Sequence, residues 1–531
     1  MSKQVIIAGV SLILAVGVII GITITFQRTS NDEDKLSPTM KKVSIFCSST
    51  YYQKSCQKTL MSVNSTDPTE FIAKAILGAE EAVKKFINYS DSLIVQVKNN
   101  SLTKMALDDC KDMMNYAIDS LQASYSNLSA VISYQQSCLD GFEHDDDMKR
   151  TLQKGIVDAS ELTCNALTIV TKLVYILPKF GIQFNIPNTR KLFFVEKNGY
   201  PPWFSAKDHH LLAKIDNNNL KPNVVVAKDG SGQFKTIAAA LAVAPKNSNV
   251  RHVIYIKAGI YKEYITVGKQ YTNIVMYGSK CVKNGGGITT WQTATFSAIG
   301  NGFIAKSMGF QNTAGPKKHQ AVALRVQSDK SVFFNCRMDA YQDTLYNQAN
   351  RQFFRNCVIS GTIDFIFGDS PTFIQNSLLI VKRPMDNQFN TITAQGKDFI
   401  DESTGTVIQN CRIVPEQKLF NERFKFATYL GRPWKKFSTT VIMESTLGDF
   451  IKPEGWVQFE GPDKVNFEET LYYAEYNNRG PGANLNARVN WKGYHKIDRA
   501  SAMKFTIQSF LLSKEDWLPS TGIPFTTTLR Y

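Results

Sequence analysis

The sequence predicts an all-α helical bundle followed by an all-β parallel solenoid. Apolar residues recur at helical spacing from about residue 42 to 180, as in the run FIAKAILGAEEAVKKFI. From residue 223 onward this periodicity gives way to short β-rich runs, such as HVIYIKAG and TTVIME, that alternate with turn residues. Several of these runs end in asparagine at a spacing near one solenoid coil. Two domains of different class are therefore expected.

Length and composition agree with more than one globular domain. A chain of 531 residues is too long for one compact domain, and 43% apolar with 20% charged residues is ordinary for a globular protein. The net charge of +15 favours an acidic partner such as a nucleic acid, an anionic membrane or an acidic polysaccharide. The same charge could instead serve solubility, so the choice depends on other features of the chain.

The N-terminal segment is a candidate for targeting. Residues 4–26 contain no charged residue, and Lys3 and Arg28 flank them. As a helix, this length spans a bilayer core of about 30 Å, and no clear small-residue cleavage site follows it. We therefore interpret residues 1–28 as a signal anchor or signal peptide, with a buried soluble helix as the alternative.

Sequons and cysteines also indicate export. Five of the nine cysteines fall within residues 1–180, and small helical domains gain from disulfides in oxidising compartments. The histidines do not cluster and no Cys-x-x-Cys occurs, so a zinc site is not expected. The chain is therefore expected to be a secreted, disulfide-bonded glycoprotein. Sequons for N-glycosylation occur at Asn64, Asn88, Asn99 and Asn127.

Two polar segments flank the helical region. Residues 29–41 are predicted to form a flexible stalk, and residues 42–180 an up-and-down helical bundle. Residues 181–221 break the helical pattern with several prolines and a polar run, which indicates a linker. The basic step Arg190-Lys191-Leu192 within this linker is a candidate processing site, with an ordinary charged loop as the alternative.

The β-rich runs of residues 222–531 end in a similar way. Their asparagines are spaced by 23, 21, 20 and 34 residues, and a repeat of about 20–25 residues is typical of a β-solenoid. Because stacked coils lie about 4.8 Å apart, these asparagines should form a ladder in a turn. A β-sandwich is the competing architecture, but it requires no constant residue at one phase of each strand. The asparagines are Asn312, Asn335, Asn356, Asn376 and Asn410.

A solenoid of this repeat places two aspartates side by side. Asp343, in YQDTL, and Asp364, in DFIFG, are 21 residues apart, which is the local repeat length. On adjacent coils they should project from one face with their carboxylates close together. Like charges at that distance do not both ionise freely, so one carboxylate can act as a nucleophile while the other holds a proton as general acid. Two unrelated turn aspartates are the alternative.

Other polar and aromatic residues accompany this pair, and Gln320 and Gln342 lie near it in phase. Asp364 lies in an apolar run and needs a partner, which Arg432 can supply through a two-point contact. The amide groups of Gln320 and Gln342 can stabilise an oxyanion without adding charge. Trp434 offers a flat apolar surface for a sugar ring. Singly, each of these residues is more often structural; together they favour carboxylate-based acyl or glycosyl transfer on an acidic polymer.

These motifs resemble those of the plant pectinesterases. GIYKE, QAVAL, YQDTL, DFIFG and LGRPW occur in the order and at the spacing of that family, as do FQNTAGPKKHQAVALRV and LYYAEYNNRGPGA. The resemblance covers nearly all of residues 222–531. It implies a right-handed parallel β-helix that removes methyl esters from polygalacturonate in the plant cell wall, without a metal or an organic cofactor.

The resemblance also implies a role for each matched residue. Asp364 matches the nucleophile, Asp343 the acid and base, and Gln342 the residue that stabilises the transition state. In the implied reaction the nucleophile attacks the ester carbonyl, methanol departs, and water releases the acid from the acyl-enzyme. The positions that contact substrate are matched by Gln320, Arg432, Trp434 and Thr290.

The region before the linker resembles a second family. Residues 42–180 are similar to the pectinesterase-inhibitor domain, a four-helix bundle, that precedes many such enzymes. The segment around Arg190 resembles the basic motif at which relatives are cut. The resemblance implies a pro-region that restrains the enzyme until export. The family's cysteine pairs correspond here to Cys47–Cys56 and Cys110–Cys138, and Cys164 lies outside both.

The chain departs from the family pattern in two respects. Residues 278–280 are Gly-Ser-Lys where relatives have Gly-Asp-Gly, which should alter a loop rather than the chemistry. The family's partners for Cys336 and Cys411 are replaced by Gly309 and Ser377, so neither of those family disulfides is expected.

Two other functions stay open. A glycoside hydrolase or lyase on the same fold would also use paired acids, but the Asn-Thr-Asp, Gly-His-Gly and Arg-Ile-Lys motifs of polygalacturonases are absent from the sequence. A catalytically inactive pectin-binding or inhibitor protein is the second alternative. Nucleic-acid binding has no motif behind it beyond charge. The expected protein is a monomer that acts on methylesterified homogalacturonan in the cell wall and contacts a membrane only through residues 4–26.

Overall fold

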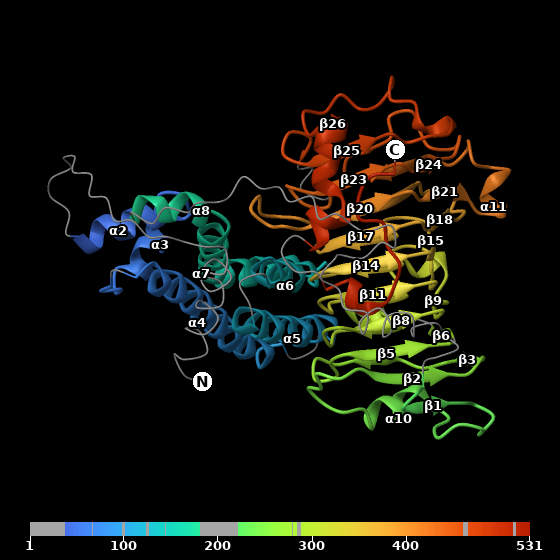
Figure 1. Ribbon diagram of the computed structural model, residues 1–531, viewed down its shortest axis with the longest axis horizontal. Helices are drawn as coiled ribbons and strands as arrows, with labels where there is room; N and C mark the ends of the chain where they lie inside the picture. Colours follow the sequence, from blue (N-terminus) through green and yellow to red (C-terminus); the bar gives the residue numbers. More distant parts are fainter. Residues whose placement is uncertain are drawn as a thin grey trace, which may run out of the picture. The chain divides into compact units, whose positions relative to one another are not determined.

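The computed structural model divides into two compact units, one helical and one built of β-strands (Figure 1). Several sequence predictions lie outside the described residues: the membrane-directed segment 1–28, the linker up to residue 220 with its basic step, and most of the loop around residues 279–287. The structure describes residues 38–65, 67–97, 101–123, 127–143, 145–180, 221–278, 280–283, 288–459, 466–512 and 517–530.

The helical unit is a bundle of long amphipathic helices. α4 lies against α5 and α7, and α6 lies against the same two helices, so each helix touches two neighbours. Asp67 and Asp145 cap α4 and α7 by accepting backbone N–H groups of their first turns. The long helices are α4 (Pro68–Ile94), α5 (Ser101–Ala123), α6 (Leu128–Asp140) and α7 (Asp146–Thr171). The shorter ones are α2 (Pro38–Cys47), α3 (Gln53–Leu60), α8 (Leu173–Ile176) and η2 (Leu177–Phe180).

Both disulfides that the family resemblance implies are present. Cys47–Cys56 joins α2 to α3, and Cys110–Cys138 joins α5 to α6. Cys164 is buried in α7 outside these two bonds. In the described part of the chain no single helix meets the length and apolarity of a membrane span; α7 meets both only together with residues 173–180, beyond a bend of 67°.

The second unit is a right-handed parallel β-helix, as predicted. Its described strands form three sheets, in which neighbouring strands come from successive coils and pair in parallel. In Figure 1 the coils stack as a column from β1 and β2, in green, to β25 and β26, in red. Short strands of this kind cannot bury an apolar face alone, so each coil depends on its neighbours for stability.

The three sheets are named I, II and III. Sheet I contains β1 (Val224–Val226), β2 (His252–Ile256), β5 (Ile274–Tyr277), β8 (Ile304–Lys306), β11 (Ser331–Phe334), β14 (Gln352–Arg355), β17 (Pro371–Gln375), β20 (Gly405–Gln409), β23 (Thr439–Met443), β25 (Tyr472–Tyr476) and β26 (Tyr494–Lys496). Sheet II contains β3 (Ile260–Tyr261), β6 (Lys280–Lys283), β9 (Gly309–Asn312), β12 (Arg337–Asp339), β15 (Val358–Gly361), β18 (Leu378–Val381), β21 (Arg412–Pro415) and β24 (Thr446–Leu447). Sheet III contains β4 (Ile265–Val267), β7 (Phe296–Ala298), β10 (Leu324–Val326), β13 (Leu345–Asn347), β16 (Ile366–Gly368), β19 (Asn390–Gln395) and β22 (Thr428–Gly431).

Two apolar clusters stabilise the β-helix. One fills its interior with stacked side chains, such as Phe333 on Phe354 at 4.8 Å between ring centroids. The other lies between sheet I and the C-terminal segment, where Ile507 and Leu511 of η7 (Ile507–Leu512) pack near Phe353 and Phe373. Both clusters consist of residues of this unit alone, so the β-helix closes its own core.

The asparagine ladder occupies the turn after sheet I. Asn335, Asn356, Asn376 and Asn410 each directly follow a strand of that sheet and have φ between +52° and +56°. Asparagine tolerates this left-handed conformation better than most other residues. Asn410 Nδ2 donates to Asn376 Oδ1 at 2.7 Å, which links two coils through their side chains.

The prediction for Asn312 is wrong. Asn312 ends β9 in sheet II, and its buried Nδ2 donates to the carbonyl oxygens of Thr293 and Val322. The ladder position of that coil is Ser307, with φ of +53°, whose hydroxyl accepts from Asn335 Nδ2 at 3.0 Å. An apolar run followed by asparagine occurs at the ends of strands in two different sheets, so the pattern alone did not separate them.

Three cysteines lie in the core, each directly after an asparagine of the ladder in the sequence. Cys336, Cys357 and Cys411 are buried thiols, and Ser377 takes the equivalent position between the last two. The Ser377 N–H lies 3.3 Å from Cys411 Sγ. Burial raises the pKa of Cys411 to about 12, so this thiol stays protonated and serves as a small apolar side chain.

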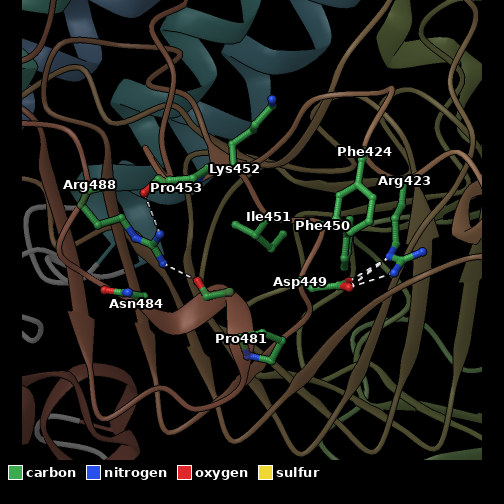
Figure 2. A pocket seen from close by; sticks show the side chains of 12 residues that line it. Arg423, Phe424, Asp449, Phe450, Ile451, Lys452, Pro453, Pro481, Asn484 and Arg488 are labelled. Carbon is green, nitrogen blue, oxygen red and sulfur yellow. Dashed lines mark hydrogen bonds and ion pairs between the residues drawn. The ribbon is translucent and has the colours of Figure 1, made fainter.

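A pocket of about 410 Å³ opens near the C-terminal coils (Figure 2). On one side of it Arg423 makes a two-point contact with Asp449, and its guanidinium lies 4.3 Å from the ring centroids of both Phe420 and Phe424. On the other side lies Arg488. Both guanidinium groups already have carboxylate partners, and Lys452 is a third basic side chain in the lining.

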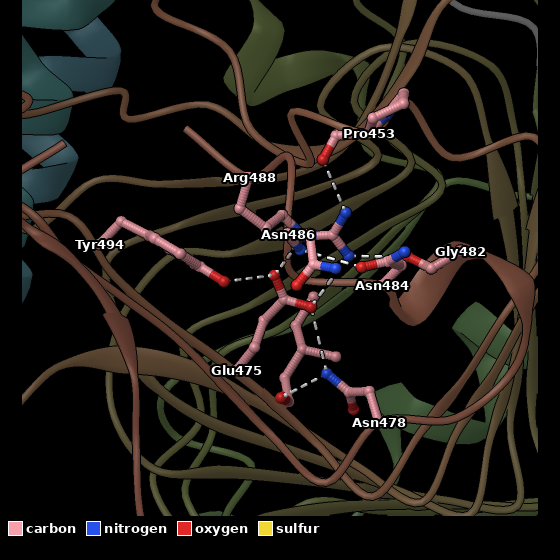
Figure 3. A network of polar contacts seen from close by, with 9 residues as sticks. Pro453, Glu475, Asn478, Gly482, Asn484, Asn486, Arg488 and Tyr494 are labelled. Carbon is pink, nitrogen blue, oxygen red and sulfur yellow. Dashed lines mark hydrogen bonds and ion pairs between the residues drawn. The ribbon is translucent and has the colours of Figure 1, made fainter. Parts of the chain in front are cut away.

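The second of these ion pairs is completely buried (Figure 3). Arg488 Nε lies 2.7 Å from Glu475 Oε1, and each side chain is 1% exposed. The same guanidinium donates to the carbonyl oxygens of Pro453 and Gly482 at 2.9 and 2.7 Å. Tyr494 adds a hydrogen bond to the carboxylate at 3.2 Å. The pair therefore ties two loops to β25 and β26.

We expect Arg488→Met to lower the free energy of unfolding of the β-helix by about 3–5 kcal/mol, because it leaves the buried Glu475 charge without its partner. Arg423→Met is the matched control, since the side chains of Arg423 and Asp449 are 20% and 41% exposed. The control should cost no more than about 1 kcal/mol. Denaturant unfolding measures the free energy of unfolding of both variants. Equal losses would contradict the conclusion that the buried Arg488–Glu475 pair is the more costly one to break.

Candidate active site

Asp343 and Asp364 occupy equivalent positions on adjacent coils. β13 pairs with β16 so that Leu345 lies beside Ile366, and each aspartate stands two residues before its member of that pair. Both aspartates adopt left-handed backbone, with φ of +63° and +49°, and each is 7% exposed. The N–H of Asp343 donates to the carbonyl oxygen of Ile363 at 3.1 Å, which joins the two turns directly. The shared phase expected from the spacing is therefore present.

Arg432 and Thr391 orient the Asp364 carboxylate. Arg432 donates through Nε to Oδ1 at 2.9 Å and through Nη2 to Oδ2 at 2.6 Å, which is the two-point contact expected from the sequence. The Thr391 hydroxyl donates to Oδ1 at 2.6 Å and accepts the N–H of Asp364 at 2.9 Å. Thr391 thus fixes both the side chain and the left-handed backbone of this aspartate.

The guanidinium of Arg432 is itself held in place. Its backbone N–H donates to the carbonyl oxygen of Thr393 in β19 at 3.0 Å. Its charged group lies 4.5 Å from the ring centroid of Phe459 and 5.9 Å from that of Phe389. Since the Arg432 side chain is only 14% exposed, these rings and the Asp364 carboxylate limit its freedom to move.

The glutamines and Thr290 lie on the coils before Asp364. Gln342 directly precedes Asp343, and its carbonyl oxygen accepts the N–H of Ala321 at 3.2 Å. Gln320 is therefore brought one coil away from Gln342, and both side chains are half-buried. Thr290 begins the short helix η3 (Thr290–Thr293), farther from the aspartates along the β-helix axis.

A strip of aromatic rings runs along the outer face of sheet III. Tyr346 stacks on Phe367 with centroids 4.4 Å apart, Trp291 meets Tyr346 edge-on at 6.4 Å, and Phe367 meets Trp434 at 6.0 Å. Arg325 supports one end, since its guanidinium lies 3.5 Å from the Trp291 ring centroid. Side chains alternate between faces along a strand, so these rings point away from the core. Trp291, Tyr346 and Phe367 are only 8%, 5% and 6% exposed, so the half-buried Trp434 supplies most of the accessible apolar surface beside the carboxylates.

Several of these residues escaped the sequence analysis. Thr391 lies in TITAQG, and nothing in that run distinguishes a threonine that supports a carboxylate from an ordinary strand residue. A signal for the aromatic strip was available, because Tyr346 and Phe367 are 21 residues apart, as Asp343 and Asp364 are.

Two more carboxyl groups meet just beyond β16. Asp369 and Glu402 are 6% and 3% exposed, and two buried carboxyl groups that act on each other do not both ionise freely. Burial raises the pKa of both groups, and the nearby Asp369 raises that of Glu402 further. Gln395 links the pair to the site, since Nε2 donates to Asp369 at 3.1 Å and its carbonyl oxygen accepts the N–H of Trp434 at 3.2 Å.

The raised pKa of Glu402 predicts a stability that depends on pH. The folded state holds the proton of Glu402 more tightly than the unfolded state, whose pKa is near 4.5. The stabilisation is therefore complete below about pH 4.5 and is lost as the pH rises through the higher pKa of the folded state.

We expect Glu402→Gln to raise the melting temperature by a few degrees above neutral pH, where about 1 kcal/mol corresponds to about 2–4 °C. A glutamine amide can donate to Asp369 without a titrating proton. Near pH 4 the variant and the parent should melt together. Asp401→Asn, one residue away, is the control and should show no such pH-dependent gain. A gain that is the same at every pH would contradict a raised pKa of Glu402 in the folded state.

Comparison with known proteins identifies relatives of both units of the chain. The chain matches the family model Pectinesterase over residues 223–515 and the family model Plant invertase/pectin methylesterase inhibitor over residues 41–169. It is similar to probable pectinesterase/pectinesterase inhibitor 21 of Arabidopsis thaliana, at 39% identity over 99% of this chain and 83% of that protein. It is also similar to pectinesterase 4 of Arabidopsis thaliana, at 39% identity over 100% of both chains.

Among solved structures, the chain is similar to the pectin methylesterase from carrot. The TM-score is 0.57 and the sequence identity is 45%, with 58% of this chain and 99% of the carrot chain covered. The carrot chain thus corresponds to a β-helical unit alone, which supports the use of residues 222–531 as an independent fragment.

Proposed function

The chain belongs to the pectinesterase family and hydrolyses the methyl esters of pectin, and from this premise we propose that Asp364 is its nucleophile and Asp343 its general acid and base. The observation that carries the proposal is the environment of Asp364. Its carboxylate is held by two guanidinium contacts and one hydroxyl, one coil away from a second buried carboxyl group. An oriented carboxylate beside a proton donor is what displacement of an alkoxide from an ester requires.

In the first step Asp364 attacks the ester carbonyl carbon of a methylated galacturonate residue. The carbonyl oxygen becomes an oxyanion, which the side-chain amides of Gln342 and Gln320 stabilise by donating hydrogen bonds. Asp343 begins protonated and transfers its proton to the departing methoxide, so that methanol leaves and an acyl-enzyme remains.

In the second step Asp343, now a carboxylate, accepts a proton from water. The hydroxide equivalent attacks the acyl carbon, Asp364 departs as a carboxylate, and the sugar is left with a free carboxyl group. The Arg432 guanidinium returns the released Asp364 carboxylate to its starting orientation. The sugar rings pack on Trp434, whose ring the aromatic strip supports, with Thr290 at the distal end of the substrate surface.

We expect Asp364→Asn to lower the rate of methanol release from highly methylated pectin by at least about 10³-fold, because an amide cannot act as the nucleophile. The assay compares this variant with the parent in residues 222–531. Asp386→Asn is the matched control; its side chain is 77% exposed and contacts Arg383, so it should keep the parental rate. Full activity of Asp364→Asn would refute the nucleophile assignment.

The same assay addresses the other functions. New reducing ends without methanol would indicate a glycosidase or lyase. A folded parent fragment that releases neither product would favour an inactive pectin-binding or inhibitor protein.

The helical unit is proposed to be a pro-region that restrains the catalytic unit until export. Its disulfides and its match to the inhibitor family support this role. Removal is proposed at Arg190–Leu192, and residues 4–26 would hold the uncleaved chain to a membrane. Asn64 and Asn88 are exposed and can accept glycans. The mature protein is proposed to act as a monomer in the cell wall.

Binding to demethylated pectin is expected to depend on salt. The protein carries a net charge of +15, and its product is polyanionic. Retention on polygalacturonate should fall steeply between about 0.1 M and about 1 M salt, because the Debye length falls from about 10 Å to about 3 Å. Affinity chromatography on immobilised polygalacturonate measures this, with fully methylated pectin as the uncharged control. Retention that does not change with salt would contradict an electrostatic interaction.

A further inference from the structure

Lys382 is a buried cation that the proposed mechanism does not use. It is 9% exposed and directly follows β18. Its Nζ lies 3.0 Å from Asp339 Oδ1 and 4.1 Å from the ring centroid of Tyr341. Burial of an ammonium group is unfavourable unless its charge is compensated. The carboxylate and the ring together therefore define where this charge can lie.

Asp339 is a fixed anchor for Lys382. In sheet II, Asp339 pairs with Ser360, which pairs in turn with Ile380 of β18, so the ion pair reaches across two coils. The Ser360 hydroxyl and Gln311 Nε2 donate to the carboxylate at 2.7 and 3.0 Å. Burial opposes its ionisation, but the charge of Lys382 and the hydrogen bond from Ser360 lower the pKa of Asp339 below its ordinary value. The carboxylate is thus charged and held from three sides.

Tyr341 connects this ion pair to the catalytic residues. It directly precedes Gln342 and Asp343, and its carbonyl oxygen accepts the N–H of Thr362 at 2.9 Å and the hydroxyl of Thr344 at 3.2 Å. Asp343 has φ of +63°, a left-handed conformation that costs free energy in a residue other than glycine and that contacts with its surroundings help to maintain. The backbone contacts and the cation over the ring therefore act on the same short turn.

The coil between Lys382 and Tyr341 also packs closely against this turn. The N–H of Lys382 donates to the carbonyl oxygen of Gly361 at 2.8 Å. A Cβ on Gly361 would lie 2.6 Å from the carbonyl oxygen of Tyr341, so only glycine permits this approach. Displacement of Lys382 would therefore move Tyr341 in two ways. One is the contact of the ammonium group with the ring, and the other is the intervening backbone of Gly361.

We propose that Lys382 is a positioning residue of the esterase, which holds the ring of Tyr341 and thereby fixes the turn that presents Gln342 and Asp343 to the ester. The inference rests on the proposed function of those two residues. A simpler role would be neutralisation of Asp339 alone. The two roles differ in outcome, because neutralisation becomes unnecessary once Asp339 loses its charge, whereas the position of Tyr341 does not.

The first experiment measures kcat and KM of Lys382→Met and Lys382→Arg in residues 222–531. Lys382→Met should lower kcat about tenfold with KM within about twofold, because misplaced catalytic groups cost more in the transition state than in substrate binding. Lys382→Arg keeps a cation over the ring and should stay within about threefold of the parent. An unchanged kcat for Lys382→Met would overturn the proposal.

Arg337→Met is the matched control. Arg337 lies 4.0 Å from the same Asp339 carboxylate, on the outside, with its side chain 51% exposed. Its removal should leave kcat unchanged within about twofold, since an exposed ion pair contributes little. A tenfold loss here would assign the effect to the charge balance of Asp339 and not to Tyr341.

Double variants separate the two roles. Lys382→Met combined with Asp339→Asn should remain impaired, and recovery of the parental kcat would leave only neutralisation. Tyr341→Phe should be active, Tyr341→Leu impaired, and Lys382→Met with Tyr341→Leu no worse than either alone, because both act through one contact. Independent, multiplying losses would also overturn the proposal.

Folding of each variant is checked by its melting temperature, so that rates refer to folded protein. If Lys382→Met does not fold, Tyr341→Leu alone decides the question, and a parental kcat in that variant refutes the inference. Full activity of Asp364→Asn would instead refute the proposed function, whatever the result at Lys382.

Discussion

In-register stacking of parallel coils is the constraint on which the rest of this structure depends. When one strand pairs with the next at a fixed phase, every residue meets its equivalent in the neighbouring coil about 4.8 Å away. The register that brings Asp343 beside Asp364 also stacks Tyr346 on Phe367. Since successive side chains point to opposite faces, the same strands supply the apolar core inside and the aromatic strip outside. The site and the core are therefore consequences of one pairing.

The turns between the sheets contain the residues with unfavourable, left-handed backbone conformations. After sheet I the left-handed positions are mostly asparagines, which accept that conformation and hydrogen bond along the ladder. Before sheet III the left-handed positions include Asp343 and Asp364. Here support comes from other coils: Thr391 holds the backbone and the carboxylate of Asp364 together. The strained backbone conformations therefore occur at residues whose side chains need a precise direction. Contacts with neighbouring coils hold these residues in place.

Buried ion pairs also connect the coils and loops of the β-helix. Arg432 with Asp364, Arg488 with Glu475 and Lys382 with Asp339 each join residues from different coils or loops. A buried ion pair adds little stability compared with apolar packing, but removal of one partner is costly. Such pairs therefore specify how coils are joined more than they strengthen the fold. Around Asp343 and Asp364 they also restrict the movement of groups that, in the proposed mechanism, meet the substrate at defined positions.

The sequence by itself determined the two fold classes, the repeat length and the shared phase of Asp343 and Asp364, because apolar periodicity and a regular spacing of 21 residues are properties of the chain alone. It also indicated Arg432 as the partner of Asp364, since a carboxylate in an apolar run requires one. It misplaced Asn312, and it gave no indication of Thr391, the Asp369–Glu402 pair or Lys382. These were decided only by the tertiary structure, because they depend on which sheet a strand joins and on side chains that reach across one or two coils. No local pattern records a contact between residues that are 27 to 43 positions apart.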